Sequence, residues 1–273
     1  VKSFAFWKPR ARLVWTPTPN RTFRLLAERA VGQLDFDDFV GAASLTSGTI
    51  SAGNADLEPD SLWRIELSYE RRFGAGSVTV AARREWISDL VDQLPVVVDG
   101  TLYDAVGNIG AARRDTVEAS LKWPLDAFGA RGVVVTADLV ARRGRATDPA
   151  TGERRPISGD LPVEARVALT HDIPAWKLRW GGGYAFARTE TAFKVEEVEA
   201  DRLAGRLDLF IEYRPDARWT LRLFGRNLTD SAATRTRDIY AGVRGDAALR
   251  YRELRVLRSG RSIGLTVQRS FGG

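Results

Sequence analysis

Residues 203–214 read LAGRLDLFIEYR, and apolar and charged side chains alternate along most of this stretch. Leu209 and Ile211 stand at odd positions, whereas Asp208 and Glu212 stand beside them at even positions. Successive side chains of a β-strand point to opposite faces of the sheet, whereas side chains on one face of a helix recur every 3.6 residues. The stretch is therefore predicted to be a β-strand with one apolar face and one mostly charged face.

The same alternation recurs in residues 62–73, 114–123 and 219–226. A period of 2 in one segment after another predicts an all-β, antiparallel protein. We expect about eleven strands, near residues 3–16, 21–33, 61–73, 77–89, 112–124, 131–143, 161–172, 176–189, 203–214, 218–229 and 251–271.

The predicted connections between these strands alternate in length. Short turns alternate with long connections, which we place near residues 34–60, 90–111, 144–160, 190–202 and 230–250. Short turns at one end and long loops at the other are typical of outer-membrane β-barrels. The strands are also long enough to cross a bilayer, which takes about 9–11 tilted residues.

Aromatic residues gather near the short-turn ends of the predicted strands. Trp15, Trp123, Trp176 and Trp219 are the clearest examples. Tryptophan is enriched where a membrane protein meets the membrane–water interface. We therefore predict that these four residues lie at one membrane interface and that the apolar face of the strands contacts outer-membrane lipid.

The composition excludes several classes of function. The 273 residues include no cysteine and one histidine, which rules out disulfides, thiolate nucleophiles, cysteine-ligated zinc and multi-histidine metal sites. We expect no catalytic residues, no metal and no cofactor. The net charge of +6 is spread over many strands rather than clustered, so no nucleic-acid partner is expected.

Two other readings of the pattern stay open at this point. A soluble β-rich binding protein would show the same alternation, with its apolar face as a core. An outer-membrane enzyme would need a serine–histidine pair, but the one histidine, His171, falls at the short-turn end. Strand length, the one-ended aromatics and the rhythm of the connections favour the membrane barrel over both.

Several motifs resemble one family, the TonB-dependent outer-membrane receptors. Residues 53–59 (GNADLEP) resemble a segment that precedes a barrel strand in these receptors, and residues 221–230 (LRLFGRNLTD) resemble their penultimate strand. Residues 263–271 (IGLTVQRSF) resemble the closing strand, with Phe271 as its terminal aromatic and two glycines after it. The resemblance covers residues 1–273, which is similar to the C-terminal part of the barrel.

The resemblance implies a Gram-negative outer-membrane location and a 22-stranded barrel, of which this chain supplies half. It implies partners outside this chain: the rest of the barrel, a plug domain, and the TonB complex that delivers energy for uptake. The ligand would be a scarce solute such as a ferric siderophore, cobalamin or an oligosaccharide. Phe271 would assist barrel assembly.

The resemblance also directs attention to two long loops. We expect ligand contacts from the loop at residues 35–60 and from the loop at residues 231–250. The second carries the candidates Arg235, Arg237, Tyr240, Arg244 and Arg250. We further expect that the chain by itself is not a complete transporter, because an open sheet leaves unpaired backbone groups in lipid.

Overall fold

The computed structural model describes residues 5–34, 42–44, 49–52, 54, 56–98 and 100–271, with the backbone only for 42–44, 49–52, 98, 101 and 102. Almost all regular structure in these residues is β-strand. The helices among them are two single turns, η2 (Asp126–Phe128) and η3 (Pro174–Trp176). None of the described helices is long and apolar enough to cross a membrane. The predicted all-β, antiparallel class is confirmed.

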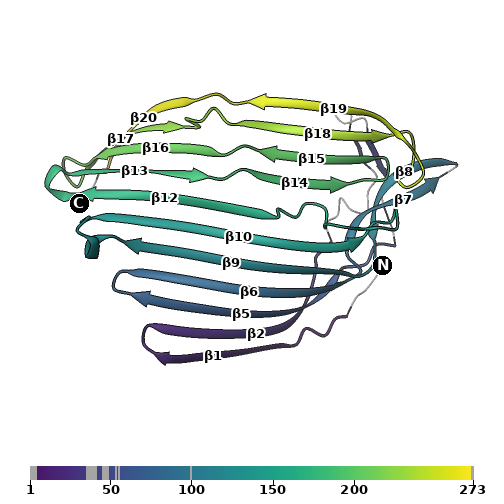
Figure 1. The fold of residues 1–273 in the computed structure, drawn as a ribbon, viewed down its shortest axis with the longest axis horizontal. Helices are drawn as coiled ribbons and strands as arrows, with labels where there is room; N and C mark the ends of the chain where they lie inside the picture. The colour runs from purple at the N-terminus through teal and green to yellow at the C-terminus, as the bar shows by residue number, and fades with distance from the viewer. Residues whose placement is uncertain are drawn as a thin grey trace.

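One large antiparallel sheet dominates the structure (Figure 1). Eleven strands of the described part lie side by side in chain order, and the two-residue strand β11 (Arg154–Arg155) pairs with the sixth of them. The eleven are β1 (Arg10–Thr18), β2 (Arg21–Val31), β5 (Ser61–Phe73), β6 (Gly76–Ser88), β9 (Ala112–Pro124), β10 (Val133–Thr147), β12 (Val163–Ile173), β13 (Leu178–Ala185), β16 (Arg206–Tyr213), β17 (Trp219–Arg226) and β20 (Ser262–Arg269). The predicted number of wall strands is confirmed.

Two smaller sheets extend the wall at the end where long connections were predicted, which we call the hairpin end (Figure 1). One contains β14 (Arg188–Phe193), β15 (Glu197–Leu203), β18 (Ala232–Tyr240) and β19 (Leu249–Arg258). The other contains β3 (Ala42–Ser44), β4 (Thr49–Ala52), β7 (Val91–Val98) and β8 (Thr101–Asn108). The long connections predicted at residues 90–111, 190–202 and 230–250 are present, but most of their residues are in strands rather than in irregular loops.

The strands in these connections were not predicted because alternation identifies only strands whose two faces have different surroundings. A period of 2 appears where one face of a strand meets lipid and the other meets water. Beyond the membrane both faces meet water, and the sequence of β18, AATRTRDIY, has no apolar side to alternate. One predicted strand, 251–271, is also divided into β19 and β20, with Gly260 between them at a φ of 72°.

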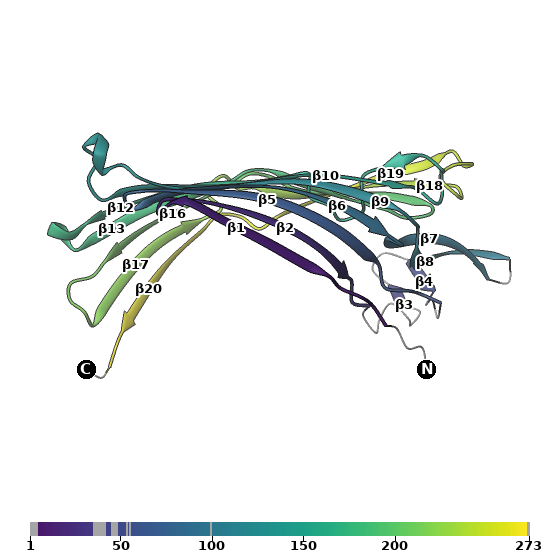
Figure 2. The same cartoon turned by 90° about the horizontal axis from the view of Figure 1, so that it is seen from below.

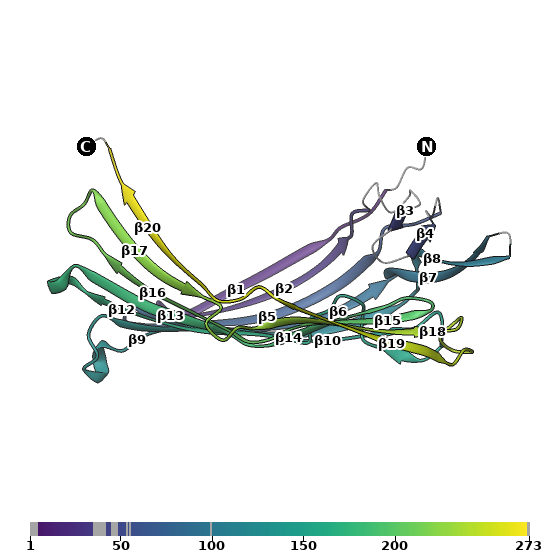
Figure 3. The ribbon, with the colours of Figure 1, turned by 90° about the horizontal axis from the view of Figure 1, so that it is seen from above.

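The large sheet curves into an open trough (Figures 2 and 3). Its two edges are β1 and β20, and the strand order does not join them to each other. The connections at the opposite end from the hairpins are short, as predicted, for example residues 19–20 between β1 and β2 and residues 74–75 between β5 and β6. We call this the short-turn end.

Burial on the two faces of the sheet is the reverse of that in a soluble protein. On the apolar face, Leu67 is 54% exposed and Ile211 is 43% exposed, although both lie in central parts of their strands. On the charged face, Glu85 is 3% exposed and Glu212 is 6% exposed. A soluble β-protein would bury the leucines and expose the glutamates. The soluble alternative is therefore wrong, and the apolar face is suited to contact lipid.

A compact apolar core lies at the hairpin end. Ile87, Leu90, Ala112, Ala146 and Ile157 are buried against one another there. They come from the ends of β6, β9 and β10 and from the segments that follow, so they join the wall to the hairpins above it. This core fixes the hairpins on the rim of the sheet.

Candidate ligand-binding face

The charged face of the large sheet is hollowed. One hollow, of about 590 Å³, is lined by residues of β12, β13, β16, β17 and β20, and a second, of about 650 Å³, extends from the same wall towards the hairpin end. Arg166 and Arg226 line both. Since the hollows lie on the charged face, that face is the concave one and the apolar face is the outer one.

Ion pairs between neighbouring strands cover this concave face. Arg64 lies 3.0 Å from Glu28 and 2.6 Å from Glu85, and Arg83 lies 2.8 Å from Glu66. Opposite charges at facing positions stabilise a sheet by about 0.2–1 kcal/mol per pair. These residues therefore pair across neighbouring strands of the wall. The pairs leave the wall polar but largely neutral.

Two arginines on the concave face lie over aromatic rings, and one of them, Arg222, is also 3.7 Å from Glu212. The Arg222 guanidinium lies 4.2 Å from the centre of the Phe210 ring, and that of Arg226 lies 4.6 Å from the Phe224 ring. Arg166 and Arg226 form no ion pair with a residue in the described part of the chain. Cation–π contacts fix the direction of a guanidinium while its N–H groups stay available.

Glycines make room for these rings. A Cβ atom on Gly264 would lie 2.4 Å from the Phe224 ring, and one on Gly181 would lie 2.5 Å from the Leu169 carbonyl oxygen and 3.1 Å from Phe210. The glycines thus let each ring lie flat against the wall under its arginine. The Gly181 backbone therefore lies close to that of the neighbouring strand β12.

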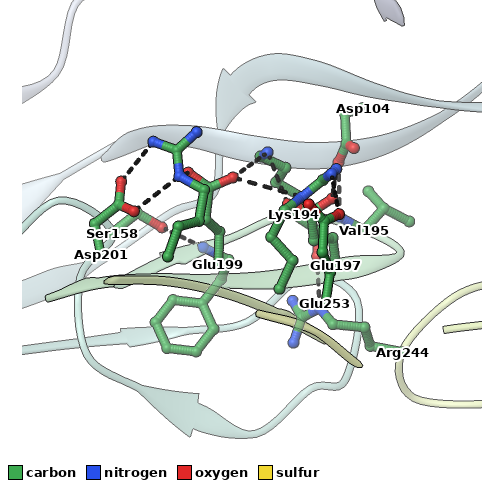
Figure 4. A network of polar contacts seen from close by, with 12 residues as sticks. Asp104, Ser158, Lys194, Val195, Glu197, Glu199, Asp201, Arg244 and Glu253 are labelled. Carbon is green, nitrogen blue, oxygen red and sulfur yellow. Dashed lines mark hydrogen bonds and ion pairs between the residues drawn. The ribbon is translucent and has the colours of Figure 1, made fainter. Parts of the chain in front are cut away.

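A second group of charges lies on the hairpins (Figure 4). Arg235 of β18 donates two hydrogen bonds to Asp201 of β15, at 2.8 and 2.7 Å. Arg237 bridges two strands, with bonds of 2.9 and 2.5 Å to Glu197 and of 3.1 Å to Glu253. Paired bonds from one guanidinium to one carboxylate are among the strongest and most directional polar contacts.

The most buried charges tie several hairpins together, and we call them the buried charge cluster. Asp148 lies 3.0 Å from Arg155 and 2.6 Å from Arg244, and Arg155 also lies 3.0 Å from Asp92. These four side chains are 2–8% exposed. The Phe193 ring lies 4.6 Å from the Arg155 guanidinium and 5.8 Å from that of Arg244. Residues from β7, β11, β14 and the connections after β10 and β18 thus meet at one point.

Burial changes the acidity of the carboxyl groups in this region. Burial raises the pKa of Asp104, although the backbone N–H of Val195 donates a hydrogen bond to it at 2.6 Å. Glu197 is also buried, which raises its pKa, but hydrogen bonds and charge from Arg237 and Lys194 prevail and the net pKa is lowered. Glu197 is therefore held as a carboxylate, whereas Asp104 is more easily protonated.

Four of the five arginine and tyrosine candidates lie in strands rather than in the predicted loop. Arg235, Arg237 and Tyr240 are in strand β18 and Arg250 is in β19, so the loop placement was wrong for these four. Arg244 alone of the five is in the connection between them, where it is buried. Carboxylates already engage Arg235, Arg237 and Arg244. Arg250 is exposed and pairs with no acidic residue that the structure describes. Much of the other candidate loop, residues 35–60, lies outside the described residues.

The predicted interface aromatics are at the short-turn end. Trp15 and Trp123 lie near the ends of β1 and β9, Trp176 is in the turn η3, and Trp219 begins β17. Trp15, Trp123 and Trp176 are exposed. Phe271 follows β20, is exposed, and lies 4.8 Å from the Arg269 guanidinium. Their roles at the membrane interface and in barrel assembly stay predictions.

The buried charge cluster was missed at the sequence level. Arg155 and Asp92 are 63 residues apart in the chain, and Arg244 and Asp148 are 96 apart. No local spacing relates such residues, and they stand in segments without alternation. Within the described ranges, no group of three or more histidine, cysteine or acidic side chains is placed to hold a metal ion.

Comparison with known proteins identifies the family. Residues 1–228 match the family model described as "TonB dependent receptor-like, beta-barrel". A comparison with curated protein sequences finds no match.

Solved structures similar to this chain include receptors and transporters. The ferric enterobactin receptor of Pseudomonas aeruginosa superposes with a TM-score of 0.64 at 15% identity, over 97% of this chain and 41% of that one. The siderophore receptor PirA of Acinetobacter baumannii has a TM-score of 0.64 at 14% identity, over 97% and 41%. The copper transporter OprC has a TM-score of 0.67 at 16% identity, over 96% and 39%. These matches show the fold, and the chain spans about two fifths of each receptor. The chain belongs to the TonB-dependent receptor β-barrel family, a family of non-catalytic transporters of the Gram-negative outer membrane.

Proposed function

We propose that the full-length receptor containing this chain binds a scarce solute at the cell surface and imports it with energy delivered through TonB. The observation that carries this proposal is the reversal of burial across the sheet, with exposed leucines outside and buried carboxylates inside. A wall of this kind supports an enclosed polar passage through a membrane. The remaining barrel wall and a plug domain would be supplied by other parts of the same receptor.

The solute is proposed to be a ferric siderophore, cobalamin or an oligosaccharide. Copper joins the solutes to be tested because one solved neighbour is a copper transporter. The experiment is uptake of each labelled solute by cells that lack their own receptor for it and express the full-length receptor. We expect energised uptake of one solute class. Uptake that continues unchanged after deletion of TonB would refute the proposal.

We propose Arg250 as a direct ligand contact and assign Arg235, Arg237 and Arg244 to holding the hairpins in place. A guanidinium without a carboxylate partner can offer its N–H groups to an anionic ligand, whereas the other three would first have to lose a partner. Tyr240, on the neighbouring strand, stays a candidate contact.

Arg250→Ala in the full-length receptor tests this assignment. A hydrogen bond to a charged group contributes about 1.5–3 kcal/mol, so the Kd for an anionic solute is expected to rise about 10- to 150-fold. Arg131→Ala, which removes an exposed arginine at the short-turn end, is the matched control. An equal loss in both variants would contradict a direct role for Arg250.

A further inference from the structure

The outer, apolar face is interrupted at one place by a group of arginines, which we call the outer arginine cluster. Arg84 of β6, Arg113 of β9, and Arg143 and Arg145 of β10 form it, around a single acid, Asp115. In the strand register Asp115 lies between Arg84 and Arg143, and Arg113 lies opposite Arg145. All five have the same strand parity as the apolar outer residues, so their side chains leave the outer face.

The cluster carries more positive charge than its own residues neutralise. Asp115 accepts a hydrogen bond from Arg84 at 2.5 Å and lies 3.5 Å from the Nε atom of Arg113. Arg143 and Arg145 form no ion pair with any residue that the structure describes. Four guanidinium groups against one carboxylate leave a net charge of +3 on three adjacent strands, so the expectation that positive charge is not clustered was wrong at this place.

The cluster lies at the height of a membrane interface. Arg113 and Trp123 are ten residues apart on β9, which corresponds to about 33 Å along a strand. With the usual barrel tilt of about 40°, this becomes ~25 Å along the membrane normal, the height of the apolar band of an outer-membrane barrel. Val117, Ala119 and Leu121 fill the outer face between them. If Trp123 lies at the periplasmic interface, the cluster lies at the headgroups of the outer leaflet.

The position in the sheet keeps the cluster accessible. β6, β9 and β10 are the fourth, fifth and sixth strands of the eleven, far from the open edges β1 and β20. Additional wall strands would join at those edges and leave the outer face of the central strands uncovered. The surroundings of this patch in the complete receptor are therefore lipid and its headgroups.

We propose that the outer arginine cluster binds phosphate groups on a lipid headgroup of the outer leaflet. Guanidinium groups form paired, charge-assisted hydrogen bonds with phosphate oxygens. Neighbouring strands are about 4.8 Å apart, so the four arginines span about 10 Å, a size suited to a phosphorylated headgroup rather than to a single small ion. The proposal depends on the outer-membrane location and not on which solute the receptor imports.

The test measures lipid binding to the purified full-length receptor by native mass spectrometry. The probes are a phosphorylated glycolipid, lipid A, the same lipid after removal of its phosphates, and inorganic phosphate. Arg143→Gln combined with Arg145→Gln removes two cations that have no ion-pair partner in the described chain. Arg131→Gln combined with Arg218→Gln removes two exposed cations at the short-turn end and is the matched control.

An interfacial arginine contributes about a fivefold increase in binding of an anionic lipid, so the double variant is expected to bind lipid A about 25-fold more weakly. The control pair and the dephosphorylated lipid should show no such difference. Equal losses in the two double variants, or equal binding of both lipids, would overturn the proposal. Displacement of lipid A by millimolar inorganic phosphate would overturn the assignment to a lipid headgroup. Heat-modified gel mobility confirms that each variant is folded.

Discussion

Replacing Asp148 with asparagine is expected to loosen the hairpin end of the receptor. Asp148 is 2% exposed, and its carboxylate contacts Arg155 at 3.0 Å and Arg244 at 2.6 Å. Asparagine has the same shape, so packing is conserved while the charge is lost. Two guanidinium groups would then lie buried with half of their neutralising charge removed.

The expected free-energy cost of the substitution depends on the partners that Arg155 and Arg244 retain. Removing one partner from a buried ion pair costs about 3–5 kcal/mol, because an uncompensated charge stays in a region with little water. Arg155 retains Asp92 at 3.0 Å, and Arg244 retains the Lys194 carbonyl oxygen. We therefore expect the lower end, about 3 kcal/mol, which corresponds to roughly a 150-fold change in a local opening equilibrium.

Hydrogen–deuterium exchange of the full-length receptor measures this opening directly. Amides around residues 148–155, the β14–β15 turn and the β18–β19 connection should exchange roughly 150-fold faster in Asp148→Asn, while amides in the centre of β9 stay protected. Asp201→Asn is the matched control, because its pair with Arg235 is about half exposed and contributes at most about 1 kcal/mol. Exchange that is no faster in Asp148→Asn than in this control would refute the reasoning.

Further predictions concern the two faces and the open edges. Leu223→Arg places a charge on the outer face near the middle of the membrane. It should lower the free energy of unfolding, measured with urea in lipid vesicles, by about 2–4 kcal/mol. Thr220→Arg faces the hollow on the same strand and should lower this free energy much less. Gly264→Val should push the Phe224 ring off the wall, which a changed near-ultraviolet circular dichroism spectrum would report and an unchanged one would contradict. The hydrogen bond from Arg235 lowers the pKa of Asp201, so the stabilising pair is complete above the ordinary pKa near 3.8 and is lost as the pH falls through the lowered pKa. Amide exchange in β18 should therefore become faster in that acidic range. Asp201→Asn should abolish this change. Residues 1–273 expressed without the rest of the receptor should not yield a closed, heat-resistant monomer in membranes, which gel mobility tests.

Most strands of the large sheet could be predicted from the sequence, because each needs apolar side chains on the face that contacts lipid. Residues such as Leu209 and Ile211 must face outward where Asp208 and Glu212 face inward, so the period of 2 and the number of wall strands are visible in any single segment. The short turns and the aromatics beside them follow from the same rule, because each strand ends where the apolar band ends.

The strands at the hairpin end could not be predicted from alternation. Strands β15 and β18 carry polar side chains on both faces, so their sequences looked like loops. Arg235 and Arg237 were therefore assigned to a loop although they lie in a strand. Their carboxylate partners also could not be identified, because many acidic residues were available and register depends on the whole hairpin.

The sequence by itself thus determined the strand class, the number of wall strands and which face meets lipid, since each of these is a property of neighbouring residues. Tertiary structure decided which charges meet. Asp148 and Arg244 come together across 96 residues, and four arginines on β6, β9 and β10 gather around one aspartate, because folding brings distant segments into one register. Pairing of this kind depends on the geometry of the complete sheet, which no local period records.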